Sequence, residues 1–97
     1  IKINVIYELY IPNSFTPNGN GRNDVFYAFS HDIKSFHMDI FDRWGEIIFT
    51  SDNINQGWDG TYKGRPVQID VYVWKINYKK VHSKKTHKEV GTVTLVR

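Results

Sequence analysis

The fold class is decided by residues 35–49, whose sequence is SFHMDIFDRWGEIIF. Over Ser35–Asp42, apolar and polar side chains alternate, which is the period of a half-buried β-strand. The apolar side chains expected to face the core are Phe36, Met38 and Ile40. Residues 43–46 (RWGE) predict a turn, and residues 47–49 predict the returning strand of a hairpin. Antiparallel β-structure is therefore expected.

The same alternation extends outward from this hairpin in both directions. Further strands are expected at Ile1–Leu9, Val25–Phe29, Val71–Tyr78 and Val90–Val96. Turn signals separate them. Thr16–Gly19 has proline and glycine where a type I turn needs them, and Asp59–Gly60 and Lys63–Gly64 are hairpin candidates. No window of a dozen residues carries a helical period with caps. The pattern predicts an all-β chain, an immunoglobulin-like antiparallel β-sandwich of about seven strands with little or no helix.

The alternation also predicts the core. The side chains expected to be largely buried are Phe36, Met38, Ile40, Trp58, Tyr72, Trp74 and Leu95. Tyr72 and Trp74 share one face of a predicted strand, and the neighbouring valines lie on the other. One of these two sets must be less buried or cover an edge.

Length and composition limit the remaining possibilities. The chain has 97 residues, 40% apolar and 24% charged, which is ordinary for one globular domain covering residues 1–97. No apolar run reaches the roughly 18 residues of a transmembrane helix. With no cysteine, disulfides, thiolate catalysis and cysteine-ligated zinc are excluded. The chain starts at Ile1 without a signal-peptide pattern, so we expect a piece of a larger protein.

Charge is distributed unevenly along the chain. Four basic residues stand against eight acids up to Thr61, whereas nine basic residues stand against two acids from Tyr62 onward. A basic half can be a solvated face or can bind a partner of opposite sign. The residues of this possible recognition surface are Lys79, Lys80, Lys84, Lys85, Lys88 and Arg97. Few aromatic residues interleave with these lysines, so nucleic-acid recognition is not expected.

No catalytic constellation stands out. Ser30, His31 and Asp32 are neighbours, but neighbours in an extended segment point to opposite faces, so a nucleophile with its base is not expected. Asp39 and Asp42 diverge in the same way. We predict a protein that is not an enzyme and holds no cofactor.

Residues 18–24 (NGNGRND) resemble the opening of a calcium loop, with Asp or Asn at alternate positions. Arg22 occupies one of these positions and only Asp24 carries negative charge, so we predict a compact structural turn and no metal site. The asparagines are expected to cap backbone amides, and the glycines to hold positive φ. His82 and His87 are separated by an odd spacing and do not predict a metal clip.

Three tryptophans, six tyrosines and six phenylalanines leave a glycan-binding module open as a second hypothesis, because sugars stack on exposed rings. Trp58 and Trp74 lie in strand-like contexts where burial is expected, whereas Trp44 lies in a turn. A row of exposed aromatic rings would favour glycan binding. A hairpin with its tip at His82–Ser83 is also expected, and it carries five of the lysines of the possible recognition surface. Salt-dependent binding by this lysine-rich hairpin would instead indicate a polyanion-binding module.

Five sequence blocks, in order, carry a resemblance to a known family. They are Ile11–Phe26, Ile40–Glu46, Gly57–Gly64, Asp70–Ile76 and Gly91–Arg97. The chain resembles the gliding-motility-associated C-terminal domain, the type B sorting domain of the type IX secretion system of Bacteroidota. The motif residues that we single out are Phe15, Thr16, Pro17, Asn18, Gly19, Gly21, Asn23, Asp24, Trp44, Gly45, Trp58, Asp59 and Gly60. Asn20 stands where the family usually has aspartate, which lowers the expectation of calcium further.

The resemblance implies a C-terminal secretion signal. Such a domain would send a cargo protein, already in the periplasm, across the outer membrane to the cell surface or the medium. Similar domains depend on a PorP-type outer-membrane barrel protein, so the resemblance implies that partner.

Overall fold

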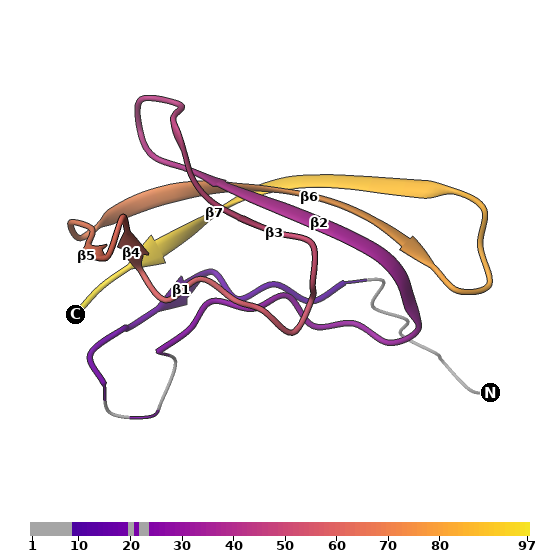
Figure 1. The fold of residues 1–97 in the computed structure, drawn as a ribbon, viewed down its shortest axis with the longest axis horizontal. Helices are drawn as coiled ribbons and strands as arrows, with labels where there is room; N and C mark the ends of the chain where they lie inside the picture. Colours follow the sequence, from indigo (N-terminus) through magenta and orange to yellow (C-terminus); the bar gives the residue numbers. More distant parts are fainter. Residues whose placement is uncertain (1–8, 20, 22–23) are drawn as a thin grey trace, which may run out of the picture.

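The fold is a five-stranded sheet backed by a layer of extended loops (Figure 1). The computed structural model describes residues 9–19, 21 and 24–97, and these contain no helix. The expected strand at Ile1–Leu9 therefore lies outside the described residues, except for Leu9. The strands are β1 (Ser14–Phe15), β2 (Ile33–Phe41), β3 (Ile47–Ser51), β4 (Thr61–Tyr62), β5 (Arg65–Pro66), β6 (Asp70–Lys80) and β7 (Thr86–Leu95).

The large sheet has the order β1-β7-β6-β2-β3, and β4 and β5 form a separate small hairpin. All neighbours in the large sheet are antiparallel except β1, which pairs parallel to β7. The hairpins β2–β3 and β6–β7 follow the sequence prediction, with the first closed by the expected turn. The fold is the predicted all-β, immunoglobulin-like sandwich.

The second layer consists of loops that touch one another at single residue pairs. Two antiparallel bridges join it, Tyr10 with Phe29 and Phe26 with Trp58. The predicted strand Val25–Phe29 is therefore wrong as a continuous strand. The backbone of this segment hydrogen-bonds to Trp58 at Phe26 and to Tyr10 at Phe29, so neither pairing continues into a ladder. Gly57 permits the close approach, since a Cβ there would lie 2.5 Å from the Phe26 carbonyl oxygen.

Aromatic side chains fill the space between the two layers. Trp58 is fully buried, packs 5.3 Å from Phe15 and meets Tyr72 edge-on at 5.1 Å between ring centroids. Its indole Nε1 donates to the Thr61 carbonyl oxygen at 2.9 Å, so the buried polar group is satisfied. All seven predicted core side chains are buried: Phe36, Met38, Ile40, Trp58, Tyr72, Trp74 and Leu95.

The two faces of β6 differ as the alternation requires. Tyr72 and Trp74 face the core, while Val71 is 47% exposed on the outer face of the sheet. Trp74 lies across Gly91 of β7, where a Cβ would come within 2.4 Å of the indole ring. Glycine at this position therefore lets the ring lie flat on the neighbouring strand.

Turn predictions had mixed outcomes. Lys63 and Gly64 both have positive φ (53° and 79°) and close the predicted β4–β5 hairpin. Asp59–Gly60 does not join two paired strands, so this hairpin prediction is wrong; the Asp59 carboxylate instead makes a local turn by accepting hydrogen bonds from the Thr61 amide and hydroxyl. At Thr16–Gly19 the Asn18 amide donates to the Thr16 carbonyl, a three-residue turn in place of the expected type I turn.

Candidate recognition surface

The loop at residues 18–24 is organised by one carboxylate. Asp24 accepts hydrogen bonds from the backbone amides of Asn18 (3.1 Å), Gly19 (2.9 Å) and Gly21 (2.6 Å). Gly19 and Gly21 have φ of 80° and 81°, the left-handed geometry expected of them. Asn20, Arg22 and Asn23 lie outside the described residues. Both Asp24 oxygens accept backbone amides, which gives this side chain a structural role.

The other motif residues meet beside this loop. Gly60 is buried, has φ of 82° and lies where a Cβ would be 2.9 Å from the Pro17 ring and 3.2 Å from Leu95. Phe15 packs on Trp58 directly behind this contact. Three sequence blocks that are far apart therefore converge on the end of β7. Phe15, Trp58 and Leu95 of these blocks contribute to the core.

Trp44 differs from the other two aromatic motif residues, Phe15 and Trp58, because its side chain is 76% exposed and theirs are buried. It lies in the turn between β2 and β3, residues 42–46, which we call the Trp44 turn (Figure 1). Asp42 Oδ1 accepts the amides of both Trp44 and Glu46 at 2.9 Å. The Asp42 and Gly45 amides close the turn at 3.0 Å, and Gly45 has φ of 82°.

Arg43 lies over the Trp44 ring, with the guanidinium carbon 5.6 Å from the ring centroid. Its Nε also pairs with Asp70 Oδ2 at 3.4 Å. Hydrogen bonds from the Val71 amide and the Gln68 side chain, together with the Arg43 charge, lower the pKa of the Asp70 carboxyl. Asp70 is therefore a carboxylate near neutral pH and holds Arg43 in place.

The basic residues do not form one patch. Lys80 Nζ donates to Ser30 Oγ and to the His31 carbonyl oxygen, both at 2.7 Å, so it joins β6 to the loop layer. Arg97 donates to the Val67 carbonyl oxygen at 2.7 Å, at the opposite end of the molecule from the β6–β7 connection (Figure 1). The other four residues of the predicted recognition surface lie at the β6–β7 hairpin and its connection: Lys79, Lys84, Lys85 and Lys88.

A hydrogen-bonded cluster of one histidine, two aspartates and a threonine on the outer face of the sheet was not predicted. His37 Nδ1 lies 2.6 Å from Asp52 Oδ1, and its Nε2 lies 3.0 Å from Asp39 Oδ1. Thr50 also donates to Asp39. The hydrogen bond to Asp52 is the main cause that raises the pKa of the His37 imidazole, with Asp39 adding to it and burial opposing it. The cluster ties β2 to β3 and to the residue that follows β3. Among the described residues, no group of three His, Asp or Glu side chains could hold a metal ion.

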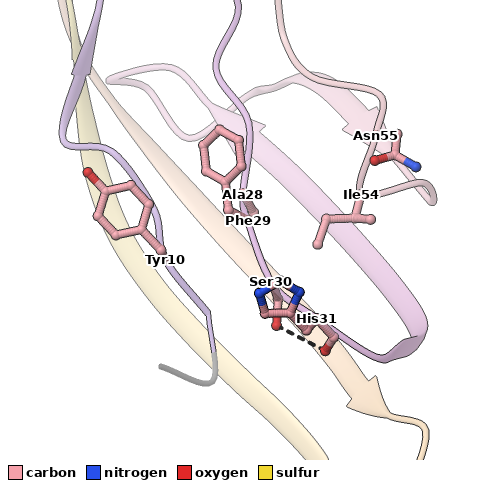
Figure 2. A pocket seen from close by; sticks show the side chains of 7 residues that line it. All are labelled: Tyr10, Ala28, Phe29, Ser30, His31, Ile54 and Asn55. Carbon is pink, nitrogen blue, oxygen red and sulfur yellow. Dashed lines mark hydrogen bonds between the residues drawn. The ribbon is translucent and has the colours of Figure 1, made fainter. Parts of the chain in front are cut away.

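A hollow of about 340 Å³ opens in the loop layer (Figure 2). Tyr10 lies on one side, Ile54 and Asn55 on the other, and Phe29 and His31 between them. Ser30 Oγ donates to the backbone oxygen of His31 at 3.5 Å, and this contact does not pair the hydroxyl with the imidazole as catalysis would need.

Comparison with known proteins identifies the family. A family model described as the type IX secretion signal domain (CHU_C) matches residues 9–95, while no curated protein and no solved structure matches the chain. The described residues contain no helix long and apolar enough to cross a membrane. The matched family acts as a secretion signal that interacts with the secretion machinery and directs export to the cell surface or extracellular space, and it is not known as enzymatic. Since the match covers nearly the whole length, the chain belongs to the type IX secretion signal domain family.

Proposed function

We propose that residues 1–97 form a single sorting domain at the C-terminus of a larger protein. The domain directs the preceding cargo from the periplasm, through the type IX secretion system, across the outer membrane to the cell surface. A PorP-type outer-membrane barrel protein binds it on the way. The observation that carries the proposal is the family match over residues 9–95, which spans every strand of the sandwich.

The architecture supports this role. A signal that accompanies folded cargo must keep its shape without help from the cargo, and the aromatic core between the two layers provides that rigidity. Most of the motif residues that the structure describes stabilise loops, turns or the core, and none of those described is arranged as a nucleophile with its base. We infer a domain that works by being bound, without chemistry or cofactor of its own.

The test is a fusion of residues 1–97 to the C-terminus of a periplasmic fluorescent protein, expressed in a host with this secretion system. We expect protease-accessible fluorescence at the cell surface or in the medium. The matched control is the same fusion in a host lacking the PorP-type protein, where we expect the fusion to stay in the periplasm. Retention in both hosts would refute the proposal, and surface delivery in both would refute the PorP-type partner alone.

Glycan binding is kept as a second candidate function because of one observation. Tyr10 and Phe29 are 56% and 52% exposed with ring centroids 6.0 Å apart, and Tyr27 lies 6.1 Å from Phe29. Tyr10 and Phe29 form an exposed pair of rings with the half-buried Tyr27 beside them. Asn55 lines the adjoining hollow (Figure 2). Affinity electrophoresis in polysaccharide gels tests it: a glycan-binding domain is slowed, and Phe29→Ala restores its mobility.

A further inference from the structure

Trp44 is exposed in a way that folding does not require. The other two tryptophans, Trp58 and Trp74, are 0% and 7% exposed and stabilise the core. Trp44 presents most of a large apolar ring to solvent, and burying it would release roughly 25 cal/mol per Å² of apolar surface. A ring of this size that contributes so little to the core is free to be buried by something else.

The turn that carries the ring is held together by hydrogen bonds. Asp42 takes two amides of the turn, Gly45 supplies the left-handed residue, and Arg43 covers one ring face while Asp70 holds Arg43. A group that is already ordered before binding loses little entropy when it binds. Such rigid presentation is what distinguishes an anchor side chain from a loosely exposed one.

The surroundings of the ring have mixed charge. A hollow of about 230 Å³ that Trp44 helps to line includes the carboxylates of Asp42 and Asp70. A second hollow of about 400 Å³, beside the same turn, is lined by Asp42 together with the cations Arg43 and Lys75. Carboxylates and cations beside one turn do not suit a uniformly anionic surface such as a lipid headgroup layer. They suit a protein with matching groups of both signs.

Resting on the proposed function, we propose that the Trp44 turn is the anchor through which the outer-membrane partner protein binds this domain. Trp44 inserts into an apolar pocket of the partner. Within the described part of the chain the terminal nitrogens of Arg43 make no hydrogen bond, so they donate to a carboxylate or backbone carbonyl of the partner. Tryptophan and arginine are the residues most enriched among those that dominate binding energy at protein interfaces.

The position of the turn agrees with this role. The described chain begins, in indigo, toward the end of the sandwich where β6 connects to β7, and the Trp44 turn protrudes at the other end with β4, β5 and the C-terminus (Figure 1). A partner bound at the Trp44 turn would therefore leave the start of the described chain uncovered.

The experiment uses the fluorescent fusion with Trp44→Ala, and with Val90→Ala as the control because Val90 is also an exposed apolar residue. We expect Trp44→Ala to reduce surface fluorescence at least about tenfold, with the fusion intact in the periplasm, and Val90→Ala to stay within about twofold of the unmodified fusion. Binding of the purified fusions to the detergent-solubilised PorP-type protein should show the same order.

Folding is checked by the protease resistance of each retained fusion. Trp44→Gln serves as a second variant, because the turn's hydrogen bonds use the Trp44 backbone and not its ring. Export of either folded variant at the unmodified level overturns the inference while the proposed function stands. Retention of the unmodified fusion overturns the proposed function, and the inference with it.

Discussion

Removal of the last strand residues, Gly91–Arg97, should unfold the domain. This deletion takes away Val93 and Leu95, which are both 0% exposed. Losing a fully buried aliphatic side chain costs about 2 to 5 kcal/mol, so the two together cost about 4 to 10 kcal/mol. The total stability of a domain is about 5 to 15 kcal/mol. The deletion also removes the partner of β1, since Ser14 and Phe15 pair with Thr94 and Leu95.

Urea denaturation followed by circular dichroism measures the effect. With a slope of about 1 to 3 kcal/mol per molar urea, a loss of this size shifts the midpoint by more than about 1 M, or leaves no folded state at all. Deleting Arg97 alone is the control, because it removes one hydrogen bond to Val67 and should cost about 0.5 to 1.5 kcal/mol. In the fluorescent fusion the long deletion should hold cargo in the periplasm. A cooperative transition at the original urea midpoint, or efficient surface delivery of the truncated cargo, would contradict this account.

Four further predictions concern the loops and the charged side chains. Gly21→Val should destabilise by about 1 to 3 kcal/mol because valine is strained at φ of 81°, and a thermal melt showing no change would count against the loop's geometry. Millimolar calcium should leave the melting temperature nearly unchanged; a rise of several degrees that Asp24→Ala abolishes would instead establish a metal site. Lys84→Gln with Lys85→Gln should leave folding and export unchanged, whereas blocked export with intact folding would place the hairpin in the recognised surface. Because the pKa of His37 is raised in the folded state, its protonation stabilises the fold. This contribution to the free energy of unfolding is fully present below the unfolded-state pKa of about 6.5 and is lost as pH rises through the folded-state pKa. His37→Gln should therefore flatten the dependence of the unfolding free energy on pH in that range, as measured by urea denaturation at several pH values.

The sheet could be predicted from sequence because its signal is local. Period-2 alternation in 35–49 and 71–78 correctly identified the buried set and the hairpin joining β2 to β3. Segment 25–29 carries the same kind of pattern but bonds different neighbours at Phe26 and Phe29, and alternation says nothing about how far a pairing extends.

The candidate recognition surface was only partly predictable. The bracing of the 18–24 loop by Asp24 follows from short-range turn chemistry. The different hydrogen bonds of Lys80 and Arg97 join residues that are 30 to 50 positions apart in the sequence, which a local pattern does not predict. The same holds for His37 and Asp52, which are 15 positions apart. The sequence pattern placed Trp44 in a turn, but only the structure shows how the ring is held and how exposed it is.

The contact between Trp74 and Gly91 links two positions that the chain cannot change independently. Because a Cβ at position 91 would lie 2.4 Å from the indole ring, Gly91→Ala forces the ring off the strand, and with it the indole hydrogen bond to the Thr92 carbonyl. A smaller side chain at position 74 would make room for alanine at 91. We therefore expect positions 74 and 91 to covary among related sequences. A large ring at position 74 should occur with glycine at position 91, and alanine at position 91 should occur with a smaller side chain at position 74.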